Sequence, residues 1–174
     1  MIRSNNKIGI FGGSFDPPHR GHLEISKIAI EKLSLAKLYW CVTKKNPFKN
    51  KTLFPLYERI KKSKYITKKI KKIRIKYFDK KIKSNNTIDL IKHLNKTNKK
   101  NTFFLIIGSD NLINFHKWKD WKLLTKLTEI VVFSRNDYDI KAKKSVIVKN
   151  VKKIIFIKNK QINISSTQIR KKLS

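Results

Sequence analysis

The chain has 174 residues, 40% of them apolar, and a formal net charge of +32. This length suits one domain spanning 1–174, the apolar fraction excludes a disordered chain, and no apolar run approaches the roughly 20 residues of a membrane span. Cys41 is the single cysteine, which excludes an internal disulfide or a multi-cysteine zinc site. The N-terminal residues lack the pattern of a signal peptide, so we expect a cytoplasmic protein.

The first half of the chain alternates predicted strands and helices. Apolar residues predict a buried strand over 7–12, which a Gly/Pro-rich turn follows at 12–18. Apolar residues between 23 and 33 then recur at the spacing of a helix. Beyond them we expect a strand at 38–43, a loop at 46–49, a helix at 57–67, a strand at 73–78 and a helix at 87–95.

The second half continues the alternation. The nearly all-apolar segment 102–107 predicts the central strand, and a Gly-Ser-Asp turn leads from it into apolar residues at helical spacing over 112–124. Strands are expected at 129–134 and 152–157, and a terminal helix at 165–173. The Lys-rich stretch 141–153 is expected to be solvated loop and strand edge. This order predicts an α/β fold, a single doubly wound Rossmann-like domain with a mainly parallel sheet, which binds ligands beyond the carboxyl ends of its strands.

The first motif follows the first predicted strand and reads Gly-Gly-Ser-Phe-Asp-Pro-Pro-His-Arg-Gly-His over 12–22. Glycines after a strand let the backbone approach a phosphate closely, and the next helix offers its first amides to an anion. His19 and His22 are three residues apart, so on the first turn of a helix they share a face and could both donate to phosphate oxygens. A Pro-rich turn with incidental polar histidines is the alternative.

The second motif, Ile-Ser-Ser-Thr-Gln-Ile-Arg, occupies 164–170. Ser165 or Ser166 is a good N-cap, and Arg170 lies one turn further on, where its guanidinium could reach the same anion. Taken alone, this is an ordinary capped C-terminal helix. Paired with the first motif, it could form the second half of a polyphosphate clamp.

Together the two motifs resemble the nucleotidyltransferase superfamily with His-x-Gly-His and Ser-Ser-Thr-x-x-Arg signatures, and more narrowly the bacterial nicotinate-nucleotide adenylyltransferases. The stretch 12–23 resembles that family's opening almost residue for residue, and 107–112 followed by 115–118 and Trp121 matches as well. The segments 46–49 and 86–90 match more loosely. The chain departs from the family at Asn86, where the family often has an aromatic residue, and it stops four residues after Arg170.

The resemblance implies transfer of the adenylyl group of ATP to nicotinate mononucleotide, which gives nicotinate adenine dinucleotide and pyrophosphate, with Mg²⁺ bound through the ATP phosphates. It implies catalytic roles for His22, His19 and Arg170. ATP would contact Gly12, Ser14, Phe15, His19, His22, Asp110, Ser166, Thr167 and Arg170. The mononucleotide would contact Asn46, Lys49, Thr87, Trp118 and Arg135. We expect a monomer or a small homo-oligomer.

Two of these roles have plain alternatives. Asp110, implied to accept hydrogen bonds from the adenosine ribose, could instead cap the helix that begins there. Trp118, implied to stack on the pyridine ring, belongs with Phe115 and Trp121 to an aromatic stripe at helical spacing, which is usually core packing.

Rival functions stay open at this stage. A nicotinamide-mononucleotide adenylyltransferase is the nearest, whereas phosphopantetheine adenylyltransferases usually have Thr where His19 stands and lack the Gly-Ser-Asp-Asn-Leu stretch. A basic nucleic-acid-binding protein is the rival from another class, and it predicts tight, strongly salt-dependent binding. Only six of the 43 basic residues are arginine, the residue that base and phosphate recognition favour, so we expect no specific nucleic-acid partner.

Overall fold

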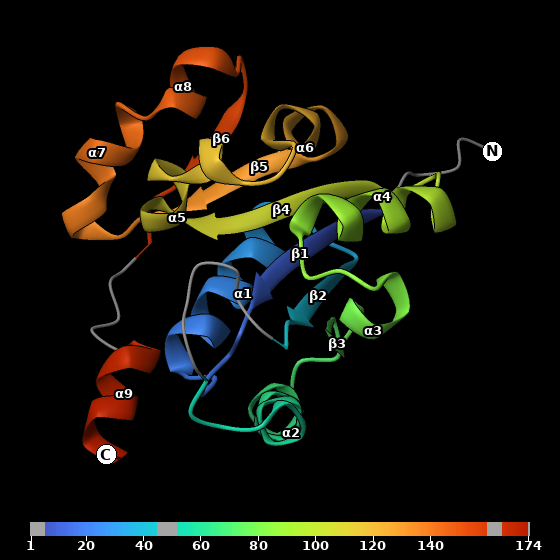
Figure 1. The fold of residues 1–174 in the computed structure, drawn as a ribbon, viewed down its shortest axis with the longest axis vertical. Helices are drawn as coiled ribbons and strands as arrows, with labels where there is room; N and C mark the ends of the chain where they lie inside the picture. The colour runs from blue at the N-terminus through green and yellow to red at the C-terminus, as the bar shows by residue number, and fades with distance from the viewer. Residues whose placement is uncertain (1–5, 45–51, 160–164, 174) are drawn as a thin grey trace.

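The computed structural model describes residues 6–44, 52–159 and 165–173, and its centre is a parallel sheet (Figure 1). All strand pairs are parallel, and the order across the sheet is β3-β2-β1-β4-β5-β6. The predicted doubly wound α/β fold is therefore confirmed. The strands are β1 Lys7–Gly13, β2 Lys37–Val42, β3 Ile73–Lys76, β4 Thr102–Gly108, β5 Glu129–Phe133 and β6 Ile154–Ile157.

Helices cover both faces of this sheet (Figure 1). They are α1 Arg20–Lys32, α2 Leu56–Thr67, α3 Asp79–Ile82, α4 Thr87–Thr97, α5 Ser109–Ile113, η1 Phe115–Lys117, α6 Trp121–Leu127, η2 Asn136–Tyr138, α7 Asp139–Lys143, α8 Val146–Asn150 and α9 Ser166–Leu173. None of the helices within the described ranges is both long and apolar enough to cross a membrane.

Strand alternation divides the apolar residues between two cores. On β4, Phe103, Leu105 and Ile107 face the core under α4, α6, α7 and α8, whereas Phe104 and Ile106 face the core under α1 and α2. Both faces of a central parallel strand are buried, which is why this segment is apolar throughout.

Two segments differ from the sequence prediction. The apolar residues over 112–124 do not form one helix, because Trp118 is extended and Asp120 has a φ of 50°, so η1 and α6 are separate. The Lys-rich stretch 141–153 is not simply loop and edge: it contains most of α7 and all of α8, with Ala142 and Ile147 fully buried. Its lysines cover the outer surface while these apolar side chains pack on the core, so the loop prediction was wrong.

Candidate active site

A cavity of about 760 Å³ opens at the carboxyl ends of β1, β2 and β4. The strand order reverses between β1 and β4, and ligands of doubly wound folds bind at this switch point. Its size lies within the range of small-molecule sites. Among the residues that line it are Gly12, Ser14, Phe15, His19, His22, Thr87, Asp110, Trp118, Arg135, Ser166 and Thr167.

The two histidines of the first motif are held by the start of α1. His19 is the N-cap of this helix, and its Nδ1 accepts a hydrogen bond from the Gly21 amide at 3.1 Å. The His19 amide in turn donates to His22 Nδ1 at 3.2 Å, which completes a reciprocal capping pair. Because a neutral imidazole that accepts at Nδ1 carries its proton on Nε2, both rings are held as Nε2–H donors.

Electrostatics keep His19 neutral. Burial, and to a lesser extent the positive charge of Arg135, lower the pKa of His19 to about 4. The ring centroids of His19 and His22 are 3.8 Å apart, a distance at which two imidazolium ions would repel each other strongly. The pair can therefore offer hydrogen bonds to an anion at neutral pH without the cost of charging both rings.

The rings of Phe15 and Trp40 pack next to His22. Phe15 has a left-handed backbone (φ 47°), and its ring stacks on Trp40 at 4.6 Å and lies 5.0 Å from His22. The buried Trp40 donates from Nε1 to Ser26 Oγ at 2.7 Å, and Ser26 donates to the His22 carbonyl at 2.8 Å. Sequence reasoning missed Trp40 and Ser26, since only the folded sheet brings β2 against α1.

The second motif lies against the first. The prediction that a serine caps α9 is confirmed: Ser165 Oγ accepts from the Gln168 amide, and the Gln168 side chain accepts from the Ser165 amide. Ser166 Oγ donates to the Pro17 carbonyl at 3.0 Å. This contact brings together segments 149 residues apart in the chain, and α9 lies near the loop that leads into α1 (Figure 1).

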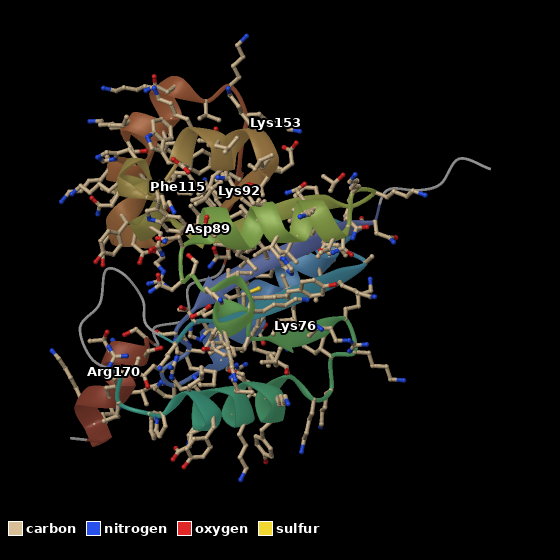
Figure 2. The ribbon with its side chains drawn as sticks, turned by 45° about the vertical axis from the view of Figure 1, so that its right-hand side comes forward. Lys76, Asp89, Lys92, Phe115, Lys153 and Arg170 are labelled. Atoms are coloured by element: carbon tan, nitrogen blue, oxygen red, sulfur yellow. The ribbon has the colours of Figure 1, made fainter. Side chains whose placement is uncertain are left out.

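Arg170, which Figure 2 labels on α9, makes the second contact between the motifs. Its Nη1 donates to the Asp16 carbonyl at 2.7 Å and lies 3.8 Å from the buried Asp16 carboxylate, and its Nη2 donates to Thr167 Oγ1 at 3.0 Å. These bonds use two of the five N–H donors of the guanidinium.

Asp110 forms an ion pair with Arg135, whose Nη1 lies 3.4 Å from an Asp110 oxygen. Asp110 belongs to the first turn of α5, and Gly108 occupies the N-cap position. A Cβ at Gly108 would collide with the Asp110 carboxylate and press on the Arg135 side chain, so a larger residue would force this pair to shift. The charge of Arg135 thus lies beside Asp110 and is near enough to His19 to lower the pKa of that ring.

The remaining predicted residues divide into two groups. Thr87 is the first residue of α4 and follows the extended N-cap Asn86, so the positive end of this helix faces the cavity. Trp118 is half-buried at the cavity wall, and its ring stacks on the buried Phe115 at 4.8 Å. Trp118 therefore packs on the core and also lines the cavity, so it fits both the core-packing and the ligand-stacking interpretation. Asn46 and Lys49 lie outside the described residues.

The carboxylates around the cavity already have partners. Asp16 accepts from the Leu53 and Phe54 amides, Asp79 accepts from Thr43 Oγ1 and the Lys44 amide, and Asp110 pairs with Arg135. Over 6–44, 52–159 and 165–173, no group of three or more His, Cys, Asp or Glu residues could hold a metal ion.

Comparisons with known proteins show the family to which the chain belongs. The model of the cytidylyltransferase-like family matches residues 10–172. A probable nicotinate-nucleotide adenylyltransferase of Pelagibacter ubique (strain HTCC1062) is 49% identical over 173 residues, which cover 98% of this chain and 96% of the relative. Another of the same name, from Rhizobium meliloti (strain 1021), is 36% identical over 74% of this chain and 68% of its own length.

Solved structures show the same fold. The Plasmodium falciparum nicotinic acid mononucleotide adenylyltransferase complexed with APC superposes with a TM-score of 0.80 at 21% identity, covering 96% of this chain and 83% of that one. The same enzyme complexed with NaAD gives a TM-score of 0.78 at 23% identity, with the same coverage.

Proposed function

The chain belongs to the cytidylyltransferase-like family and within it to the nicotinate-nucleotide adenylyltransferases, and we propose that it transfers the adenylyl group of ATP to nicotinate mononucleotide. The products are nicotinate adenine dinucleotide and pyrophosphate. The observation that carries the proposal is the contact between the two phosphate motifs at the mouth of one cavity, where Ser166 and Arg170 bond the Asp16–Pro17 backbone.

In the proposed reaction a phosphate oxygen of the mononucleotide attacks the α-phosphorus of ATP. The bond from that phosphorus to the oxygen bridging to the β-phosphate breaks, and its electron pair leaves with pyrophosphate. No covalent enzyme intermediate and little proton transfer are required, so catalysis is mainly alignment and stabilisation of charge. His22 and His19 would donate from Nε2 to the phosphate oxygens, which the bonds at their Nδ1 atoms support.

The other ATP contacts follow from the position of each residue. Gly12, Ser14 and Phe15 would bring their backbone close to the phosphates, because Gly12 lies at the end of β1 and the other two lie in the loop between β1 and α1. Ser166, Thr167 and Arg170 would hold the β- and γ-phosphates as these become the leaving group.

Asp110 would accept hydrogen bonds from the adenosine ribose. Mg²⁺ would come bound to the ATP phosphates and neutralise part of their charge. The chain's carboxylates at the cavity fit that arrangement, since each is already hydrogen-bonded or ion-paired within the protein.

The pyridine nucleotide would lie on the α4 side of the cavity. Trp118 would stack on the pyridine ring, and the first amides of α4 at Thr87 would bind the nicotinate carboxylate. A helix N-terminus favours a negative group by up to about 2 kcal/mol, or about thirtyfold, so nicotinate should be preferred over the uncharged nicotinamide. We extend the mononucleotide contacts to Asn46, Lys49 and Arg135; the pairing of Arg135 with Asp110 puts it within reach of ATP as well.

One experiment tests the function. Pyrophosphate release from ATP is measured side by side with nicotinate mononucleotide, nicotinamide mononucleotide and phosphopantetheine. We expect the highest kcat/KM with nicotinate mononucleotide. Turnover that favours phosphopantetheine, or none with either pyridine nucleotide, would reject the proposal.

A further inference from the structure

Arg59 is a buried cation next to the cavity, and no sequence motif singled it out. It lies on α2 with 1% of its surface exposed, although a charged side chain is seldom buried without strong partners. Its partners are four backbone carbonyls. Nη1 donates to the carbonyls of Ser14 at 2.6 Å and Thr43 at 2.8 Å, Nη2 to that of Lys44 at 3.0 Å, and Nε to that of Phe54 at 3.0 Å.

These carbonyls come from separate segments that meet at the cavity. Ser14 belongs to the loop between β1 and α1, and Thr43 follows the last residue of β2; both line the cavity. Phe54 lies just before α2, beside the point where Asp16 accepts from the Leu53 and Phe54 amides. One guanidinium therefore joins the loop of the first motif to the end of β2 and to the entry of α2.

The direction of these bonds matters for an anion site. A peptide carbonyl is the negative end of its dipole, and a carbonyl turned into the cavity would repel phosphate. Bonding to Arg59 holds the carbonyls of Ser14 and Thr43 toward the protein interior. Burial lowers the pKa of Arg59, while the negative charges of Asp16 and Asp79 raise it, and a guanidinium stays protonated in such surroundings.

We propose that Arg59 is a positioning residue for adenylyl transfer: it sets the loop around Ser14 and the end of β2 so that the phosphates meet the histidines in a reactive alignment. This inference rests on the function proposed above. It extends to the second motif, because the Asp16 carboxylate accepts from the amides of Leu53 and Phe54, and the Asp16 carbonyl accepts from Arg170.

The test compares two conservative changes on α2 in the full chain. Arg59→Lys keeps the positive charge, but the single ammonium nitrogen of lysine cannot reach all four carbonyls that the three guanidinium nitrogens of Arg59 bind. Thr67→Val is the matched control, since Thr67 is also buried on α2 and its hydroxyl donates only within the helix, to the Ser63 and Lys64 carbonyls. Each variant is assayed well below its own melting temperature.

We expect Arg59→Lys to lower kcat about tenfold or more while changing the KM of ATP less than about threefold, because misalignment is felt mainly in the transition state. Thr67→Val should lower the melting temperature and leave kcat unchanged. If Arg59→Lys behaves like Thr67→Val, with reduced stability and normal kcat, then Arg59 is only structural and the inference is wrong.

A second readout separates this inference from the proposed function. Hydrogen–deuterium exchange needs no substrate, and Arg59→Lys should speed exchange in peptides that cover 10–18 and 41–44 more than in those that cover β4. If Arg59→Lys changes exchange in 10–18 and 41–44 no more than in β4, the positioning role is wrong, even if the wild-type chain proves to have another activity. Absence of pyrophosphate release by the wild type, with the local exchange effect present, would instead reject the adenylyl-transfer function alone.

Discussion

His22→Asn is the change that best separates catalysis from folding at this site. The Oδ1 atom of asparagine lies about where the imidazole Nδ1 lies, so it can still accept the His19 amide hydrogen that closes the capping pair. Asparagine has no atom at the position of Nε2, so the donor proposed for the phosphate is lost. The variant should therefore keep the fold and lose the chemistry.

The magnitude follows from the two bonds taken separately. Loss of one donor to the charge that develops in a transition state costs about 3 kcal/mol, which lowers kcat about a hundredfold or more. Loss of a helix cap costs about 1 kcal/mol, which would lower the melting temperature of a chain of this size by about 2–4 °C. His22→Asn should show the first effect without the second.

His22→Gln is the complementary variant. Its amide nitrogen can reach the position of Nε2, but it offers no acceptor near Nδ1, so the His19 amide loses its side-chain partner. We expect a kcat closer to that of the wild type and a melting temperature lower by about 2–4 °C. Steady-state pyrophosphate release and thermal unfolding by circular dichroism measure both variants. Near-normal turnover in folded His22→Asn would refute the role of Nε2.

Three further predictions concern other parts of the site. Arg170→Ala should raise the KM of ATP about tenfold or more and barely change that of the mononucleotide, as separate titrations of each substrate would show; the reverse pattern would mean that the motif binds the other substrate. Nicotinate mononucleotide should quench tryptophan fluorescence, and Trp118→Ala should remove most of the quenching and raise the mononucleotide KM at least about tenfold. A large fall in melting temperature with unchanged affinity would instead make Trp118 a core residue. Because the pKa of His19 is lowered to about 4 in the folded state, the unfolded chain takes up this proton first as the pH falls from about 6.5 to 4. Stability should fall over that window by no more than about 2 kcal/mol after solvent screening, and less so in His19→Asn, as urea unfolding at pH 7 and 4.5 would measure; equal losses in both proteins would exclude His19 as the cause.

The sheet and the motifs could be predicted because their signals are local. Buried parallel strands are continuous apolar runs such as 102–107, and the residues that follow them are brought to one edge of the sheet by the topology alone. Helix α8 escaped prediction because it has only five residues, Val-Ile-Val-Lys-Asn, and Ile147 is its one buried side chain. Its stability comes from packing on the core, which no short window of sequence reports.

Arg59 and Trp40 could not be predicted for a different reason. The four hydrogen-bond partners of Arg59 are backbone carbonyls, which every residue has, and one of them is 45 residues away. No residue type marks such a partner in the sequence. Trp40 looks like any apolar strand residue until β2 pairs with β1 and brings its indole against Phe15 and Ser26.

Some side chains of the site are held firmly and others form weak pairs that a ligand could replace. This difference matches the role proposed for each. His19, His22 and Phe15 are held by backbone hydrogen bonds or stacking, so their donors need no rearrangement as charge develops on phosphate. The Asp110–Arg135 pair is partly exposed on both sides, and such a pair contributes at most about 1 kcal/mol. A ribose hydroxyl could therefore replace Arg135 on Asp110 at little cost, and the released guanidinium would be beside the triphosphate. Binding of ATP would then replace only the weak Asp110–Arg135 pair. The histidines that donate to the phosphates in the transition state would already be in position.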